Sequence, residues 1–525
     1  MRWMLFVAFV CPAAIAANPG DKTAKEKQPT HTETDAVGWA FDALLKYPED
    51  RRACVRFVYL PPWADPEWIG VMDFAVNSAC GHSRNLHRAD RHAGGWLLGY
   101  DLSKYATGEK LERLLSVWDG CATDDPYFHI SRVNQDGGPL PVLAPHLGEA
   151  LARHATNNTA KRVDALVADM TGSTGAVYRA DWFLEQLLTS IRGRYPEFRQ
   201  IEFDPEGPHT PLQTHMKKRG FFLEQSIGIG GEKGALLLIS GVTGKSRVIL
   251  TVFGLGSRTP LVTTYDFADR RTRPDEQFIR NLLSVDAFAD AAEVFVPMPN
   301  GLLEFVLADG KGQIQRSAPP DVVADSTKPD GHTKELEMGM SCIMCHTPNN
   351  GYNTARNDME LLIGADVDLF ADGGTVGGKH LTRDELVDVV AGRYGERIDE
   401  PDGLLGRARR DYVRAVARLT DYTVEADGPS AVARLGQKIK EIYHGYRYAR
   451  VTPERVCLEL GVACAPGAGP RTLRRLVPAV NQTTEDILIA LLRNGAVIKR
   501  DDLEAIYAEM ARRATANRPA LLEAL

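Results

Sequence analysis

The sequence lacks most of the short motifs that identify enzymes. It contains no Gly-x-Ser-x-Gly and no His-Glu-x-x-His, so it shows neither a serine-hydrolase nor a zinc-protease signature. The run Gly244-Lys245-Ser246 is no phosphate-binding loop, because Ile239 stands where that loop needs its first glycine. After the N-terminal segment there is no uninterrupted apolar stretch of about 18 residues, so we expect no transmembrane span in the mature chain.

An excess of positive charge is also absent. The chain has 62 Lys and Arg against 69 Asp and Glu, a net charge of −7, which argues against nucleic acid as a partner. Hydrophobic residues make up 44% and charged residues 25%, both ordinary for globular proteins. With 525 residues, the chain is long enough for about two to four domains.

The N-terminus has the pattern of a secretory signal peptide. Arg2 begins a short basic region, residues 3–10 are apolar, and Ala14-Ile15-Ala16 is a small-residue cleavage site. The apolar run is shorter than the roughly 20 residues that span a bilayer. We therefore predict a signal peptide at 1–16, a polar and disordered leader at 17–35, and a periplasmic or secreted bacterial protein.

One five-residue stretch, Cys342-Ile343-Met344-Cys345-His346, carries more information than any other. Its pattern, Cys-x-x-Cys-His, is the attachment signature of a c-type haem. Each thiol can add to one haem vinyl group, and the adjoining imidazole can bind the iron as its proximal ligand. We expect one covalent haem c, held by Cys342 and Cys345, with His346 as an axial ligand.

A bare Cys-x-x-Cys also fits a redox disulfide or half of a zinc site. A zinc site would need a second closely spaced pair of ligands, and Cys457 and Cys464, with six residues between them, fit that poorly. A thioredoxin-like disulfide would lie between a strand and a helix, whereas a loop is expected after the motif. The adjoining His346 favours haem over both.

The other cysteines suggest disulfides. Eight cysteines occur, and seven remain once the signal peptide with Cys11 is removed (8 − 1). In an oxidising compartment we predict that Cys457 pairs with Cys464. Two of the remaining three can also pair, and the sequence does not choose among Cys54, Cys80 and Cys121.

The sixth ligand of the iron is left open by the sequence. Downstream of the motif, Met359 is very close and Met510 very far, and Met510 has the periodic setting of a core residue, so we expect neither to bind iron. His444, in an aromatic-rich stretch, and His380, after a glycine pair, are candidates for the distal ligand. An empty distal site is the third alternative.

The hydrophobic patterns predict an α+β protein, with a mixed N-terminal region containing β-hairpins and a mainly helical, cytochrome c-like haem domain after it. We place a small α+β domain at 36–145, a second α+β domain ending in a β-meander at 146–325, and the haem domain at 326–525. Asp181 is expected to cap a helix, and Thr382 with Glu385 to form a capping box. Further helices are expected at 67–79, 108–118, 159–170, 404–419, 452–460, 484–493 and 502–513.

Three segments together resemble a group of large exported bacterial proteins with a single c-type haem domain. The segments are Arg179-Ala180-Asp181-Trp182-Phe183, then residues 298–305 with 309–312, then residues 339–346. The resemblance extends over roughly residues 50–470 and implies haem binding and electron transfer, but it brings no substrate. The chain departs from the group at the Gly- and Asp-rich residues 365–380.

These observations lead to three functional hypotheses. The first is a periplasmic electron-transfer protein, and the second is a haem enzyme or ligand sensor with an open distal iron site. The third is a binding module in which the haem is structural. A carrier alone needs only about 100 residues, so the part of the chain before the haem motif is expected to bind or orient a partner that the sequence does not name.

Overall fold

The described part of the chain leaves out both termini and several internal segments. In the computed structural model, it comprises residues 33–127, 163–173, 175–221, 233–237, 247–252, 259–266, 290–318, 320, 323–349, 351, 374–376, 379–394, 404–422, 430–460, 462, 464, 467–476 and 497–516.

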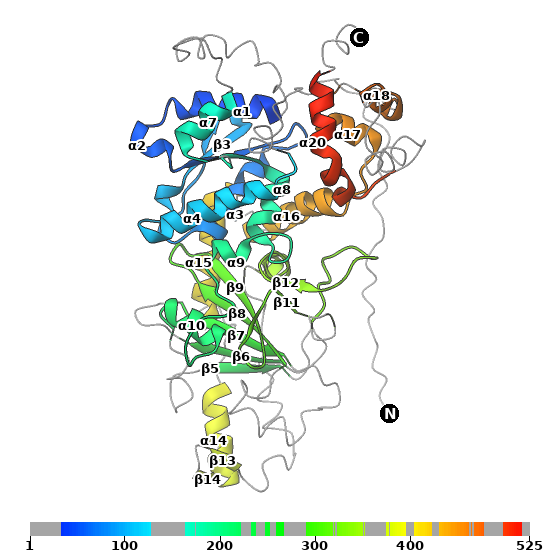
Figure 1. The fold of residues 1–525 in the computed structure, drawn as a ribbon. Coiled ribbons are helices and arrows are strands. Elements are labelled where there is room, and N and C mark those ends of the chain that lie inside the picture. The colour runs from blue at the N-terminus through cyan, green and yellow to red at the C-terminus, as the bar shows by residue number, and fades with distance from the viewer. Residues whose placement is uncertain are drawn as a thin grey trace.

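The N-terminal part forms a four-stranded mixed sheet in the order β2-β3-β1-β4 (Figure 1). Its strands are β1 (Val55–Tyr59), β2 (Asp90–His92), β3 (Leu97–Asp101) and β4 (Val177–Arg179). Strand β1 pairs antiparallel with β3 and parallel with β4. Every residue of β1 and β3 is buried, so both faces of this sheet are covered.

Helices supply that cover. Helix α1 (Glu33–Leu44) packs on β1, β3 and β4, and α7 (Val163–Thr171) packs on α1. Helix α8 (Ala180–Leu188) packs on β1 and β4 and against α3 (Glu67–Cys80), which Figure 1 shows on the side of the sheet away from α1. The other helices of this part are α2 (Glu49–Arg52), η1 (Ala93–Gly95), η2 (Leu102–Lys104), α4 (Glu109–Gly120), η3 (Cys121–Thr123), α9 (Tyr195–Phe198) and α10 (Pro211–Lys218).

The middle of the chain forms a six-stranded sheet in the order β10-β9-β8-β7-β6-β5. Each neighbouring pair is antiparallel, so the strands follow one another as a meander. Its strands are β5 (Lys233–Leu237), β6 (Arg247–Val252), β7 (Leu261–Asp266), β8 (Ala291–Pro297), β9 (Leu303–Asp309) and β10 (Ile314–Gln315). The turn at Asn300-Gly301 joins β8 to β9, with Gly301 at φ 87°.

The Cys-x-x-Cys-His motif lies on helix α12 (Met340–His346). Before it, β11 (Ser317–Ala318) and β12 (Leu336–Glu337) form a short antiparallel pair, and after it comes η7 (Thr347–Asn349). Helix α12 packs on β12 and on α16 (Ala431–Arg447). Helix α15 (Leu404–Thr420) packs against α16 and α3.

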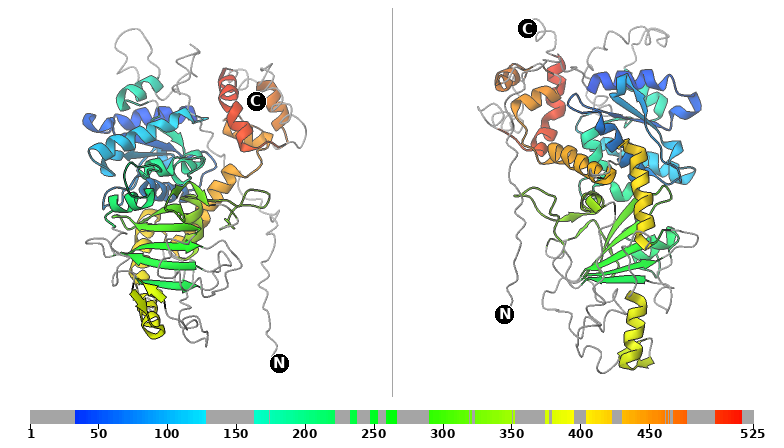
Figure 2. Two further views of the ribbon diagram at one scale, coloured as in Figure 1. Left: turned by 60° about the horizontal axis from the view of Figure 1, so that its bottom comes forward. Right: turned by 180° about the vertical axis from the view of Figure 1, so that it is seen from behind.

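The remaining elements lie at two ends of the molecule (Figure 2). The hairpin β13 (Gly374–Val376) and β14 (Lys379–Leu381) leads into α14 (Arg383–Tyr394), which packs on β5. At the other end, α17 (Pro453–Glu459), α18 (Gly469–Leu476) and α20 (Arg500–Ala516) form a small group of helices.

The mixed α+β class, the first-sheet strands and the meander are confirmed. The capping box is also confirmed, since the Thr382 amide donates to Glu385 at 2.8 Å and the Glu385 amide donates to Thr382 at 3.4 Å. The prediction that Asp181 is an N-cap is wrong: Arg179 takes the cap position, and Asp181 lies in the first turn, paired with Arg179. The helix predicted at 484–493 and the signal peptide lie outside the described residues.

Contacts cross the boundaries that we predicted between domains. Helices α15 and α16 follow the Cys-x-x-Cys-His motif in the chain, yet they pack on α3, and α16 also packs on α8. Helix α1 begins at Glu33, inside the segment expected to be a disordered leader, whose residues 17–32 lie outside the described part. The predicted domain boundaries state which parts of the chain fold independently, and they remain a prediction.

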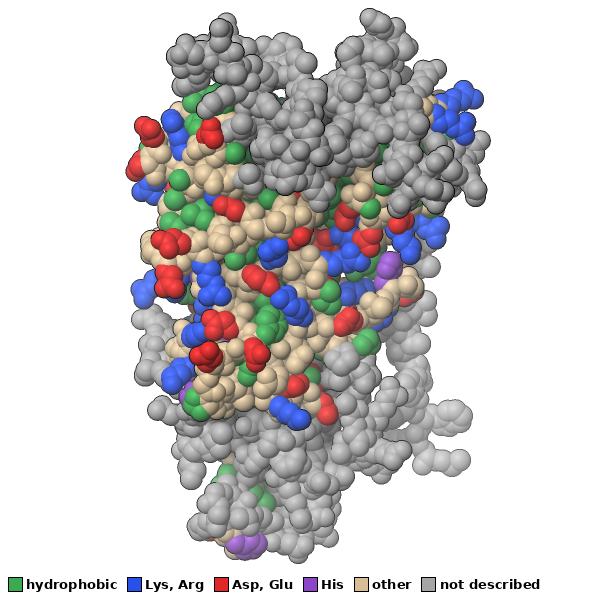
Figure 3. Space-filling view, in the orientation of Figure 1, with side chains coloured by type: hydrophobic (Ala, Val, Ile, Leu, Met, Phe, Trp, Pro, Cys, Tyr) green, Lys and Arg blue, Asp and Glu red, His purple; other side chains and the backbone are tan. Residues whose placement is uncertain are grey.

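The face of the molecule in Figure 3 carries acidic and basic side chains interspersed over its described part. This distribution agrees with nearly balanced totals of 62 basic and 69 acidic residues. Within the described residues, the helices are too short or too polar for any of them to cross a membrane.

Candidate functional site

Helix α12 places the three motif side chains together. It begins after Gly339, whose φ of 88° lies in the left-handed region that favours glycine. A Cβ at that position would stand 2.9 Å from the Tyr195 ring, so a larger residue would disturb the start of the helix. Because side chains three and four positions apart share a helix face, Cys342, Cys345 and His346 project toward the same side.

The two motif thiols differ in exposure. Cys342 is fully buried, whereas Cys345 is half-buried. Burial raises the pKa of the Cys342 thiol well above its usual value, and the carboxylate of Glu293 raises it further through its charge and a hydrogen bond. The Cys342 thiol also contacts the Glu337 carbonyl oxygen, with a sulfur-to-oxygen distance of 3.9 Å.

His346 is buried against the six-stranded sheet, with 5% of its surface exposed. Its ring meets Phe295 edge-on at 4.5 Å between centroids, and Phe305 lies at 5.9 Å. Its Nε2 is 3.5 Å from Glu293 Oε1, longer than an ordinary hydrogen bond. Its Nδ1 is buried and has no hydrogen-bond partner among the described residues.

Glu293 connects the motif to a cavity. It lies on β8, opposite Leu307 of β9 and Thr264 of β7, and is 7% exposed. The cavity has a volume of about 290 Å³. Its lining includes Asp266, Asp290, Glu293, Leu307, Ala318 and Leu336. The side of His346 that bears Nε2 therefore faces a carboxylate at the wall of this cavity.

These residues fit a covalently attached haem. The two thiols and the imidazole share one helix face in the order that attachment requires. Phe295 and Phe305 give the imidazole an apolar surround. A buried imidazole with no well-formed hydrogen bond among the described residues costs free energy, which a bound ligand would offset.

The structure does not bring either predicted distal histidine next to His346. His444 lies on α16, half-buried, with its ring 5.2 Å from Tyr448, and burial followed by the charge of Lys440 lowers its pKa to about 4. His380 is exposed on β14. Helix α14, which follows β14, packs on β5, and three strand spacings, about 14 Å, separate β5 from β8 in the sheet.

The structure places the other sequence candidates as follows. Met510 is 1% exposed in α20, as expected of a core residue, whereas Met359 lies outside the described part.

Burial is the main cause that raises the pKa of the Cys457 thiol, and Cys464 raises it further through its charge and a hydrogen bond. The two thiols are therefore neighbours. No disulfide joins Cys457 and Cys464 in the structure, and their pairing stays a prediction. The described residues contain no group of three or more His, Cys, Asp or Glu side chains arranged to hold a metal ion.

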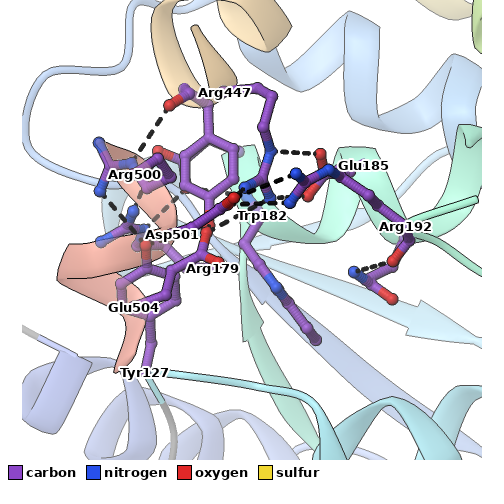
Figure 4. Close-up of polar contacts among 12 residues, drawn as sticks. Tyr127, Arg179, Trp182, Glu185, Arg192, Arg447, Arg500, Asp501 and Glu504 are labelled. Carbon is purple, nitrogen blue, oxygen red and sulfur yellow. Dashed lines mark hydrogen bonds and ion pairs between the residues drawn. The ribbon is translucent and has the colours of Figure 1, made fainter. Parts of the chain in front are cut away.

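A buried ionic network that we did not predict joins the first sheet to the C-terminal helices (Figure 4). Arg179, at the end of β4, is fully buried and donates to Asp181 at 2.7 Å and to Glu459 at 3.0 Å. Glu459, at the end of α17, also accepts from Arg500 at 2.8 and 2.9 Å. The guanidinium of Arg179 stacks 3.5 Å from the centroid of Tyr127.

The network extends to helices α8 and α16. Arg447 of α16 pairs with Glu185 of α8 and, at 2.5 Å, with Asp501 of α20. Arg192 donates to the same Asp501 at 2.8 Å. Elements from the N-terminal part (β4 and α8) and from the C-terminal part (α16, α17 and α20) thus meet at one cluster of charges. The sequence offered a signal only at Arg179 and Asp181, within a segment singled out for its resemblance.

A second buried carboxylate holds the six-stranded sheet to its neighbours. Glu304 of β9 is fully buried and accepts from Arg199 at 2.7 Å and from Arg219 at 2.9 Å, with His215 also in contact. Burial alone would raise the pKa of Glu304, but the positive charges of Arg199 and Arg219 outweigh it, so its pKa lies well below the usual value. Arg199 also donates to the Gly81 carbonyl at 3.1 Å, which ties α3 to the sheet.

Comparison with protein-family models, with curated proteins and with solved structures finds no match for this chain. The site must therefore be interpreted from its own residues and their surroundings.

Proposed function

We propose that this protein is an exported, periplasmic c-type cytochrome-domain protein that holds one haem covalently and transfers electrons. The observation that supports it most is the Cys-x-x-Cys-His pattern on a single helix, with its histidine buried against Phe295 and Phe305 of the six-stranded sheet. The signal-peptide pattern at residues 1–16 agrees with it, because bacteria attach c-type haem outside the cytoplasmic membrane.

Each motif residue has a defined part in this proposal. Cys342 and Cys345 would hold the group through thioether bonds, and His346 would bind its iron. Phe295 and Phe305 would fix the plane of the imidazole and exclude water from it. Bound there, haem supplies an iron that cycles between Fe(III) and Fe(II). We further propose that α12 and the helices after it form a cytochrome c-like, haem-binding part of the chain.

A second candidate function is a haem enzyme or ligand sensor with an open distal site. It is supported by the positions of His444 and His380, neither of which is a neighbour of His346 among the described contacts. The cavity beside Glu293 supports it as well, since a ligand or substrate needs space near the iron.

The proposal is tested by asking whether haem is covalently attached. After expression with a c-type haem maturation system, acid-acetone extraction should leave the colour with the protein, and the absorption spectrum should give one haem per chain. The double variant Cys342→Ala with Cys345→Ala should lose the covalent haem. Cys54→Ala, a half-buried thiol outside the motif, is the matched control and should keep it.

The two candidates are separated by the ferric spectrum. A low-spin spectrum with no response to cyanide or carbon monoxide supports electron transfer, and a high-spin spectrum with ready binding supports the enzyme or sensor. A Met-to-iron charge-transfer band in the near infrared would contradict our expectation that no downstream methionine binds the iron. Haem that extracts fully into acid acetone, or a double variant with unchanged haem content, would refute covalent attachment.

A further inference from the structure

Helix α15 has one outward face of uniform positive charge. Among its described side chains, at residues 405–420, the exposed ones are all arginines: Arg407, Arg410, Arg414 and Arg418. At about 3.6 residues per turn, these four positions fall within a sector of about 80° around the helix axis. With a rise of about 1.5 Å per residue, they form a line about 16 Å long. We call this line the arginine row.

The other faces of α15 are used by the fold. The helix packs against α16 and α3, and its apolar side chains Leu405, Val416 and Leu419 are buried. Seen from behind in Figure 2, α15 is the yellow-orange helix on the near side of the molecule. The arginine row is therefore the part of this helix that another molecule can reach.

A row of like charges is unfavourable in the free chain. Arg410 and Arg414 are four residues apart, as are Arg414 and Arg418, and like charges at this spacing destabilise a helix. Asp411 lies 3.6 Å from Arg414, but the Arg414 side chain remains 74% exposed. The whole helix has five arginines and one aspartate, a net charge of +4 (5 − 1), in a chain of net charge −7.

Helix α16 shows what an ordinary solvent-facing side looks like. It packs beside α15 and has the same length of 17 residues. Its exposed residues are Arg434, Gln437, Glu441 and Gly445, so charges of both signs and uncharged residues alternate along it. Contact with water therefore does not account for the uniform charge of α15, whereas a negatively charged partner does.

The inner side of α15 lies against the turn that follows the Cys-x-x-Cys-His motif. The Gly351 amide donates to the His346 carbonyl at 3.0 Å, and a Cβ at Gly351 would stand 2.5 Å from the ring of Tyr412 on α15. A helix is about 10 Å thick, so a molecule on the arginine row would be separated from this turn by about one helix diameter.

We infer that the arginine row is the docking surface for the protein that exchanges electrons with this one, and that this partner presents a row of Asp and Glu carboxylates. The electron exchange rests on the proposed covalent haem, whereas the docking surface does not. One electron crosses the contact: the partner is oxidised as Fe(III) becomes Fe(II), or reduced as Fe(II) becomes Fe(III).

The chemistry of the row favours a protein over a membrane. Each guanidinium can donate two parallel hydrogen bonds to one carboxylate, and carboxylates one turn apart on an acidic helix match the spacing of the arginines. Opposite charges also speed the encounter and set the orientation of the two proteins. A helix that binds a membrane surface inserts its apolar face, and that face of α15 is buried.

The test measures binding of a defined acidic probe to the full chain. The probe is a dye-labelled helical peptide of about 20 residues, with four Glu at the spacing of the arginine row, and its counterpart has Gln at these positions. The row variant combines Arg407→Gln, Arg414→Gln and Arg418→Gln. The matched control removes three exposed positive charges elsewhere and combines Arg84→Gln, Lys110→Gln and Lys311→Gln.

At low ionic strength, the row variant should raise the dissociation constant of the Glu peptide about tenfold or more, and the control should change it less than about twofold. The Gln peptide should bind all three chains weakly. Because the row substitutions remove repulsion, the row variant should unfold at the same temperature as the unmodified chain or above it.

The second readout is the rate at which the haem-loaded chains are reduced. Fe(II)-EDTA is an anionic reductant and hexaammineruthenium(II) a cationic one. The row variant should be reduced about threefold or more slowly by the anionic reductant and no more slowly by the cationic one. The control should be reduced by each reductant at about the rate of the unmodified chain.

Each outcome bears on one part of the inference. Equal peptide affinities in the row variant and the control would overturn the docking surface. Row-dependent binding to phosphatidylglycerol vesicles without binding of the peptide would overturn the choice of a protein partner. Row-dependent peptide binding with unchanged reduction rates would overturn electron exchange at this surface. Row-dependent peptide binding by a chain without covalent haem would overturn the proposed function and leave the docking surface standing.

Discussion

Replacing Glu459 by glutamine should destabilise the protein more than almost any other single charge-neutralising change. Glu459 is fully buried and accepts bonds from Arg179 at 3.0 Å, Arg500 at 2.8 Å and Arg455 at 2.7 Å. Glutamine keeps one acceptor oxygen, but its NH2 group replaces the other oxygen and places a hydrogen-bond donor against guanidinium groups, which are also donors. Removing one partner of a buried ion pair typically costs about 3–5 kcal/mol, because the remaining charges stay buried without compensation. In the variant Arg179 still pairs with Asp181, so we expect the loss of stability to be near the lower end of this range, about 3 kcal/mol.

The effect should depend on pH in a defined direction. Burial alone would raise the pKa of Glu459, but the charges of Arg179 and Arg500 outweigh it, so its folded-state pKa lies below its usual value. Its ion pairs therefore contribute stability above the unfolded pKa of about 4.3, and the contribution is lost as pH falls toward the folded pKa. The difference between the unmodified chain and Glu459→Gln should be constant from about pH 7 to pH 5 and shrink below about pH 4.

Urea unfolding followed by circular dichroism and tryptophan fluorescence measures the change. Trp63, which lies 3.7 Å from the Arg455 guanidinium, reports on the network directly. Glu441→Gln is the matched control, since Glu441 lies on exposed α16 surface and pairs with Lys438, and it should change stability by less than about 1 kcal/mol. A loss below about 1 kcal/mol for Glu459→Gln at pH 7 would refute the view that this network is a major stabilising contact.

Two further predictions concern α16 and α17. Gly436→Ala should destabilise the chain by about 1–3 kcal/mol, measured by thermal unfolding, because the new Cβ would stand 2.5 Å from the Cβ of Thr347. Gly445→Ala on the same helix, where a Cβ meets nothing within 4 Å, should be neutral or stabilising, and equal losses in both would contradict the packing explanation. Cys457 and Cys464 should be joined by a disulfide in the exported protein, and a non-reduced peptide map that finds both thiols free would disprove it.

Local structure was predictable where its cause was local. Asn300-Gly301 favours a tight turn whatever surrounds it, and the turn joins β8 to β9 as expected. Thr382 and Glu385 satisfy each other's backbone groups within one helical turn, so their capping box could also be predicted. The arrangement of the motif on α12 could also be predicted locally, because the spacing of Cys342, Cys345 and His346 places the three side chains on one helix face.

Contacts between distant segments could not be predicted in this way. Nothing in the sequence near Glu293 indicates that β8 will lie against α12, so the carboxylate beside His346 appeared only with the fold. The sequence candidates for a distal ligand, His380 and His444, lie downstream of the motif, whereas the carboxylate that faces the imidazole lies upstream. Asp181 has the residue type of a helix cap, but its carboxylate pairs with Arg179, which also donates to Glu459 from a helix near the other end of the chain.

The pairing of Arg179 with Glu459 has a consequence for the order in which the chain can acquire its structure. The two residues are 280 positions apart, so all four strands of the first sheet precede Glu459 along the chain. Until Glu459 follows, the first sheet can form, but Arg179 lacks the carboxylate of Glu459 that it pairs with in the complete structure. The C-terminal helices therefore complete the N-terminal sheet. A chain that is cut short before residue 459 leaves a charged and incompletely covered surface on that sheet.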